Sequence, residues 1–322
     1  MRRKQPGFPA RRRKGRAGFA LLAVVWGTGL IAMMVVAFMT AGRLRLQTAH
    51  NIASATEASF VAESAINLAT LALLSKVAAS SANQTGAAEV YDGKPRFCVL
   101  DRAAVAVAVE DEGGKIDLNM APPELLQAML VGLGLEGRAA KDVTNAIIAF
   151  RTAQAPGEFG ATPASDKAID QKRALFETVM ELDQVNRVDP ALFHALIPFV
   201  TVHSRSPGID QTASPPALFA ALSGFPVEQV RQLAAAPYPN GLKRNDPRFP
   251  ANFKQPADHG AFLIHAEALL ATGQSIAKDA ILDLRPSNGK QFAVKELRRG
   301  QSLYAQSLRE MIATNGAGIP DC

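Results

Sequence analysis

Residues 10–94 contain few acidic residues, one long uncharged run and no proline. No acidic residue occurs among the first eighteen residues, and no charge of either sign occurs between Arg16 and Arg43. No proline lies between Ala10 and Lys94. Because proline is the strongest helix breaker, its absence permits one uninterrupted helix through most of this stretch.

Recognisable catalytic and zinc motifs are missing as well. The nucleophile pattern G-x-S-x-G does not occur. The histidines show neither zinc-ligand spacing nor a convincing nucleophile partner; they are His50, His194, His203, His259 and His265. We therefore expect no enzyme activity.

Cysteine is scarce, with Cys98 and Cys322 the only two in the chain. Two alternatives stay open from the sequence. The cysteines form a disulfide if both lie in an oxidising compartment, or they are unpaired thiols with Cys98 a buried small hydrophobe.

A cluster of cations meets an apolar run near the N-terminus. Eight Lys and Arg fall within the first eighteen residues: Arg2, Arg3, Lys4, Arg11, Arg12, Arg13, Lys14 and Arg16. As a helix, Phe19 to Ala41 would be about 35 Å long, enough to cross a hydrocarbon core of about 30 Å. The positive-inside bias predicts a cytoplasmic N-terminus with the rest of the chain across the membrane. A secretory signal fits less well, because its apolar region has only about 7 to 15 residues.

The formal net charge of +6 belongs to this basic segment. Without its eight cations, 27 Lys and Arg face 29 Asp and Glu, a balance of −2. The main body therefore lacks the positive charge that a nucleic-acid or anionic-lipid partner would require. The roughly 280 residues beyond the apolar run predict one large domain or two small ones, and the apolar content of 48% over the whole chain is enough to form their cores.

Apolar periodicity predicts one long helix from Phe19 to about Ala79, ending in a polar stretch over residues 80–86. Two short apolar runs follow, Phe97 to Leu100 and Ala103 to Val109, separated by Asp101-Arg102. They predict a β-hairpin.

The middle of the chain has helical periodicity and the last third has strand-length runs. We expect helices over Glu124 to Leu133, Ala139 to Arg151, Ala174 to Val185, Pro190 to Ile197, Pro215 to Leu222 and Pro226 to Ala235, with a brief strand over Pro198 to His203. We expect strands over Ala261 to Ala268, Ala277 to Leu284 and Gln291 to Leu297. This order predicts an α/β domain of residues 81–110 plus 257–322, with a helical domain, residues 111–256, inserted into it.

The helical region contains an internal repeat. Ile116-Asp117, Pro122-Pro123, Leu125 and Ala128 match Ile209-Asp210, Pro215-Pro216, Leu218 and Ala221 at a constant offset of 93. The matched prolines and apolar residues set helix starts and packing faces. Two related helical units are predicted.

A glycine-rich turn within the helical region resembles motifs that bind two kinds of ligand, nucleotides and DNA. Residues Gly132 to Gly137 satisfy G-x-G-x-x-G, but they follow a helical run, whereas the nucleotide-binding motif follows a strand. The same residues resemble a helix-hairpin-helix module, as does Phe176 to Leu182, and such modules bind DNA phosphates. The negative balance of the main body disfavours DNA, so we interpret the hairpins as structural.

Several carboxylates offer the oxygen ligands that calcium prefers: Asp111, Glu112, Asp166, Asp170, Asp246, Asp258, Asp279, Asp283 and Asp321. None follows EF-hand spacing. We interpret them as solvated loop acids, with calcium as the alternative.

The N-terminal junction resembles that of type IV pilin-like precursors, in which a basic leader ends in Gly and a peptidase cuts before the apolar helix. Gly18 and Phe19 would flank the cut, which makes residues 1–18 the leader and 19–80 the transmembrane and pilin-like helix. The fifth mature position, normally Glu, is Ala23. Together with Asp111 to Asn119, the helical insert and the terminal strands, this departure resembles the K-type minor pseudopilins of type II secretion systems, the GspK family.

The resemblance implies an α+β fold: a long N-terminal helix, a small antiparallel-sheet pseudopilin domain and a large inserted helical domain of helix-hairpin-helix or SAM-like type. It implies a single-pass inner-membrane protein with a periplasmic C-terminal domain, placed at the pseudopilus tip. The implied partners are I-type, J-type and H-type minor pseudopilins, the major pseudopilin, the prepilin peptidase and the inner-membrane assembly platform, with no nucleic acid. The competing interpretation is a membrane-anchored helix-hairpin-helix protein for DNA uptake.

Overall fold

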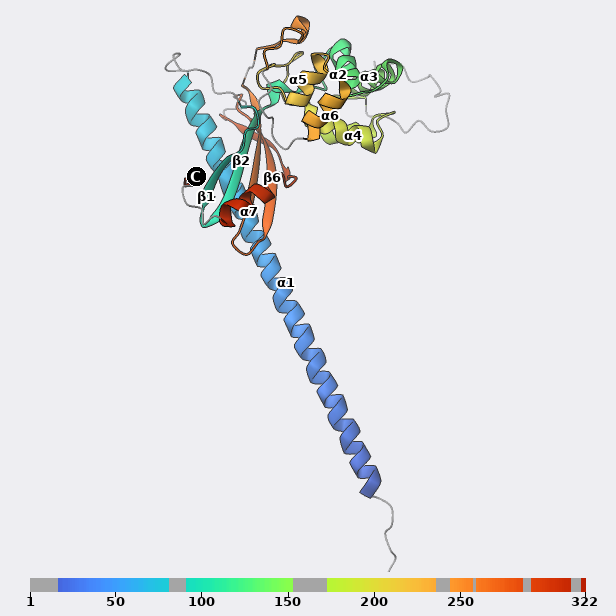
Figure 1. Ribbon diagram of the computed structural model, residues 1–322, viewed down its shortest axis with the longest axis vertical. Coiled ribbons are helices and arrows are strands. Elements are labelled where there is room, and N and C mark those ends of the chain that lie inside the picture. The colour runs from blue at the N-terminus through green and yellow to red at the C-terminus, as the bar shows by residue number, and fades with distance from the viewer. Residues whose placement is uncertain are drawn as a thin grey trace, which may run out of the picture. The chain divides into compact units, whose positions relative to one another are not determined.

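The computed structural model describes residues 17–80, 91–152, 173–235, 244–256, 259–285, 291–313 and 320–322. The chain divides into two compact units, Met1–Ser54 and Ala55–Cys322. The described part of the first unit is helical throughout, and the second unit holds the sheet and the remaining helices (Figure 1).

Helix α1 (Ala17–Ser80) is the longest element and confirms the predicted long helix. It contains no proline. Its apolar stretch has a mean hydropathy of 2.3, and this part of α1 is long and apolar enough to cross a membrane. Beyond Ser54 the helix becomes one-sided, because Ala58, Ala62 and Ala65 are buried while Phe60 is exposed.

Five antiparallel strands form the main sheet, in the order β1-β2-β5-β6-β7. Their bounds are β1 (Arg96–Leu100), β2 (Ala103–Asp111), β5 (Ala261–Leu269), β6 (Ser275–Asp283) and β7 (Ala293–Arg299). Strands β1 and β2 form the predicted hairpin, whose two turn residues both have positive φ, 47° at Asp101 and 67° at Arg102. That geometry is typical of a two-residue hairpin turn.

The two faces of the sheet have different cover (Figure 1). One face packs against the second half of α1, and its core contains Val105, Ile264 and Leu282. The other face packs against α7 (Ala305–Ala313), through Tyr304 and Leu308. Side chains that alternate along each strand supply both cores.

The helical region lies between β2 and β5 in the chain. Its helices are α2 (Pro123–Gly132), α3 (Gly137–Arg151), α4 (Pro190–Leu196), α5 (Pro216–Leu222) and α6 (Val227–Ala235), with short 3-10 helices at Glu112–Gly114, Val179–Gln184, Ile197–Phe199 and Ala251–Phe253. A two-stranded parallel ladder joins β3 (Ile116–Asp117) to β4 (Val200–Thr201). One continuous apolar core unites these helices.

The internal repeat has a structural counterpart in α2 and α5. The two helices start 93 residues apart and contact each other. A Cβ atom added to Gly132 of α2 would lie 2.5 Å from the carbonyl oxygen of Ala221 in α5, so only glycine permits this approach. Asp117 and Asp210, the repeated acids, each accept a hydrogen bond from the backbone amide two residues later.

The predicted α+β fold class is confirmed, and two local predictions are wrong. Residues Ala174 to Thr178 are not helical, and only Val179–Gln184 forms a 3-10 helix. The side chain of Asn119 accepts a hydrogen bond from the Phe176 amide and donates one to its carbonyl, which removes both groups from helical pairing. The second error concerns the C-terminal part of the chain, where the sequence analysis predicted no helix and the structure contains α7.

Candidate functional site

The predicted processing site lies at the start of α1. Gly18 and Phe19 are its second and third residues, and Ala23 follows one turn later. The side chain of Phe19 is 77% exposed, and most apolar side chains of the following membrane-length stretch are exposed too. A helix with such a surface requires an apolar environment, whether lipid or other helices.

Cys98 and Cys322 form a disulfide, with Cα atoms 5.0 Å apart and a sequence separation of 224. Beside it, the amide of Val99 donates to the carbonyl of Pro320, and the amide of Cys322 donates to Val99, each at 3.0 Å. The C-terminus is thus attached to the outer side of β1 both covalently and by backbone hydrogen bonds.

Three of the candidate calcium ligands are buried, which corrects their interpretation as solvated acids. Asp111, Glu112 and Asp283 are 1%, 2% and 4% exposed. Asp111 accepts the Gly113 amide at 2.8 Å, and its other oxygen lies 2.7 Å from Nδ1 of His259. Buried carboxylates require partners, and protein groups supply these.

Lys115 lies at the centre of one buried charge cluster. Its Nζ lies 2.8 Å from a carboxylate oxygen of Glu110 and 2.8 Å from one of Glu112. The hydroxyl of Thr201, at the end of β4, donates to the second oxygen of Glu112. Burial alone would lower the pKa of Lys115, but the two carboxylates outweigh it and raise the pKa. The cluster joins the end of β2 to the parallel ladder of the helical region.

Asp283, at the end of β6, lies at the centre of a second cluster. It lies 2.8 Å from Nε of Arg285, 3.3 Å from Arg205 and 3.7 Å from Lys295. Arg285 also donates to the carbonyl of Ser204. Burial alone would raise the pKa of Asp283, but Arg285 and Arg205 outweigh it and lower the pKa. This second cluster also joins the sheet to the helical region.

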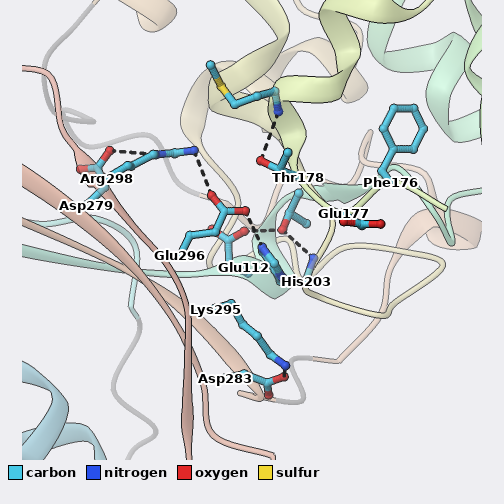
Figure 2. A network of polar contacts seen from close by, with 12 residues as sticks. Glu112, Phe176, Glu177, Thr178, His203, Asp279, Asp283, Lys295, Glu296 and Arg298 are labelled. Atoms are coloured by element: carbon cyan, nitrogen blue, oxygen red, sulfur yellow. Dashed lines mark hydrogen bonds and ion pairs between the residues drawn. The ribbon is translucent and has the colours of Figure 1, made fainter. Parts of the chain in front are cut away.

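A row of charged side chains continues from the helical region across the sheet, and Figure 2 shows its first part. Nε2 of His203 lies 3.1 Å from Glu296, whose other oxygen accepts from Arg298 at 3.4 Å. Arg298 lies 3.5 Å from Asp279, and Asp279 lies 2.7 Å from Nδ1 of His265. The hydrogen bond with His203 and the charge of Arg298 lower the pKa of Glu296.

Glu267 ends this row at the start of α7. It lies 4.0 Å from His265 and accepts hydrogen bonds from the amides of Leu303 and Tyr304 and from the hydroxyl of Ser302. Burial alone would lower the pKa of His265, but Asp279 and Glu267 outweigh it and raise the pKa to about 9. A protonated His265 between two carboxylates thus helps to hold α7 against the sheet.

This histidine gives a pH prediction. Its folded-state pKa of about 9 lies above its unfolded value of 6.5, so protonation stabilises the fold. The contribution is complete below pH 6.5 and is lost as the pH rises through 9, and we expect it to be about 2 to 3 kcal/mol. Urea unfolding of the full chain in detergent at pH 6 and pH 9.5 would measure it. The variant His265→Gln should lose this pH dependence, and an unchanged loss in that variant would contradict the assignment.

No group of three or more histidine, cysteine or acidic side chains among the described residues is arranged to hold a metal ion. Asp246 pairs with Arg248, and Asp321 forms a backbone bridge with Val99. Three of the candidate calcium ligands, Asp166, Asp170 and Asp258, lie outside the described residues.

The glycine-rich turn uses its backbone amides internally. The amides of Leu133, Gly134 and Leu135 donate to carbonyls of α2, and those of residues 223, 224 and 225 donate to α5 in the same pattern. Gly134 and Gly224 both have positive φ. These are helix C-caps, in which a glycine in the left-handed conformation lets the last carbonyls be satisfied. The amides of these six residues are therefore not available to hold a phosphate.

The sequence interpretation missed the charge clusters around Lys115, Asp283 and His265. One signal was present, because His265 and Glu267 interrupt an otherwise apolar strand. Charged residues inside a buried strand must find partners on neighbouring elements.

A similar fold occurs in the crystal structure of the GspK-GspI-GspJ complex from the type 2 secretion system of enterotoxigenic Escherichia coli. One chain of that structure matches with a TM-score of 0.51 and 17% sequence identity, over 80% of this chain and 100% of that chain. The chain described here thus has a GspK-like fold. Neither a family model nor a curated protein sequence matches it.

Proposed function

We propose that this chain is a K-type minor pseudopilin of a type II secretion system. A prepilin peptidase removes residues 1–18 on the cytoplasmic side, and α1 then anchors the mature chain in the inner membrane. The unit Ala55–Cys322 lies in the periplasm. There the protein joins the other minor pseudopilins at the tip of a short pseudopilus, initiates its assembly and supports protein export across the outer membrane.

The observation that carries the proposal is the fold match to a chain of the GspK-GspI-GspJ complex over the whole of that chain. An apolar helix of membrane length at the N-terminus and a basic, acid-free segment before it agree with a processed membrane anchor.

Two features support a position at the tip. A bulky helical region between β2 and β5 would obstruct a further subunit added above it. The apolar Ala23 agrees with the same position, because a tip subunit has no neighbour above whose terminal amine requires a carboxylate. A carboxylate without such a partner would be costly in an apolar bundle.

Co-purification tests the proposal. The affinity-tagged full chain, expressed in its native host and extracted in detergent, should retain the I-type and J-type minor pseudopilins. A tagged single-pass membrane protein of unrelated fold is the control. Recovery of neither partner above that control would refute the assignment.

The DNA-uptake alternative receives less support from the hairpin turns. Both turns use their amides for helix capping, and the guanidinium of Arg151 donates to the carbonyls of Leu118 and Ala121. Titration of the mature chain, residues 19–322, in detergent with a labelled DNA duplex at low salt separates the two functions, because the basic leader would bind DNA by itself. Salt-sensitive binding at micromolar protein would favour DNA uptake.

A further inference from the structure

The two edge strands of the main sheet differ in what pairs with their outer sides. At the β1 edge, Val99 exchanges backbone hydrogen bonds with Pro320 and Cys322, and the disulfide to Cys98 fixes that segment in place. Strand β7 forms the other edge, and no described strand pairs with its outer side. Within the described residues, the chain covers one edge with its own C-terminus and leaves the other edge open.

The backbone of β7 presents hydrogen-bonding groups on this open side. The amide of Gly300 donates to the carbonyl of Ala277 on the inner side, at 2.9 Å. Backbone groups of an antiparallel edge strand point inward and outward at alternate residues. Arg298 therefore bonds inward to β6, while Leu297 and Arg299 direct their N–H and C=O groups outward.

The side chains of β7 on the α1 face form an uncovered apolar strip. Leu297 pairs in register with Ala280, which belongs to the core beneath α1, so both side chains lie on that face. Among the described residues, that core includes side chains of β2, β5 and β6 but none of β7. Leu297 is 54% exposed and Val294 is 53% exposed. Apolar side chains next to an open strand edge are a recognition surface for another chain.

Cations surround this strip. A shallow cavity of about 300 Å³ is lined by Ile276, Lys278, Leu297, Arg298 and Arg299. Lys278 pairs with Glu63 of α1, and Arg298 pairs with acids of the sheet. Arg299 forms no ion pair with a described residue, and its side chain is exposed. The edge thus combines apolar contact area with an available positive charge.

We propose that the outer edge of β7 binds an extended acidic segment of a partner protein by strand addition. Main-chain hydrogen bonds to Leu297 and Arg299 supply the pairing, apolar side chains of the segment contact Leu297 and Val294, and a carboxylate pairs with Arg299. The inference concerns an interaction surface and does not depend on the proposed role in secretion.

The positive charge of the β7 edge favours an acidic segment over a second copy of the chain as its binding partner. Two copies joined through the same edge would each contribute the cations Arg298 and Arg299 to that edge, and this accumulation of positive charge disfavours self-association. An acidic segment removes that repulsion. Strand β7 has a bulge at Lys295. Its neighbours Val294 and Glu296 pair with Leu282 and Ile281, while Lys295 itself has no partner in β6, so regular pairing is interrupted there. The docked segment is therefore short and pairs with residues 296–300.

A peptide titration tests the proposal on the full chain in detergent micelles. The probe is a fluorescein-labelled, end-capped heptapeptide of alternating Glu and Val. One control peptide replaces every Glu with Lys, and a second carries N-methyl groups on alternate amides, which block strand pairing. We expect fluorescence anisotropy to show binding of the acidic probe at least tenfold tighter than binding of either control.

Two variants locate the binding. Leu297→Pro removes an outward-facing N–H and the exposed leucine side chain but no hydrogen bond to β6, so the sheet should remain intact while affinity for the acidic probe falls at least tenfold. Arg299→Glu should weaken binding of the acidic probe and strengthen binding of the Lys peptide. Arg309→Glu, on the exposed side of α7, should change neither affinity. Should Leu297→Pro fail to fold, Arg299→Glu and the N-methylated peptide still decide. Equal binding of all peptides, or no binding of the acidic probe, would show that the cations only protect the edge and would overturn the proposal.

Discussion

Replacing Gly18 with leucine is expected to leave the full-length precursor uncut. A peptidase that cleaves after a glycine must approach the backbone closely at that position, and a branched side chain there would block the approach. The uncut chain keeps its eight N-terminal cations, and residues 1–18 remain attached in front of the apolar helix. We therefore expect the variant to accumulate as precursor and to be absent from any complex with the other minor pseudopilins.

Intact-mass spectrometry of the membrane fraction measures this outcome, because the wild-type chain should begin at Phe19 and the variant at its original N-terminus. Gly42→Leu is the matched control. It makes the same change in the same helix, where an added Cβ would meet nothing within 4 Å, and it should be cut normally. A mature N-terminus at Phe19 in the Gly18→Leu chain would contradict both the cleavage site and the pilin-like precursor.

The elements that could be predicted from sequence are those whose signals are local. The proline-free stretch over residues 10–94 and its apolar periodicity predict α1, and the turn residues between two apolar runs predict the β1–β2 hairpin. The internal repeat was visible because prolines mark the starts of α2 and α5. In each case a few neighbouring residues determine the structure.

The missed features depend on residues far apart in the chain. Glu112 and Thr201 are separated by 89 residues, and His203 and Glu296 by 93. The amides just before α7 bond to Glu267, in a strand more than thirty residues earlier. No periodicity within a short window reports such partners. The same reason explains Phe176, whose backbone pairs with the side chain of Asn119 instead of forming a helix.

Replacing Lys115 with methionine is expected to destabilise the unit Ala55–Cys322 by about 3 to 5 kcal/mol, because one partner of a buried ion pair is removed. Methionine retains most of the volume of lysine, so packing loss is small. The loss comes from Glu112, whose side chain is 3% exposed and, among the described residues, would keep only the Thr201 hydroxyl as a partner of its carboxylate. Glu110 is 36% exposed and reaches solvent, so it contributes less. Urea unfolding of the full chain in detergent measures the difference.

A double variant separates lost charge pairing from lost packing. In Lys115→Met with Glu112→Gln, the uncharged amide still accepts the Thr201 hydroxyl, so most of the lost stability should return. Because this cluster joins β2 to the ladder of β3 and β4, hydrogen exchange of the ladder amides should rise in the single variant and fall again in the double one. If both variants were equally unstable, the aliphatic stem of Lys115 would be its main contribution. In that case the buried charges would not determine how the helical region attaches to the sheet.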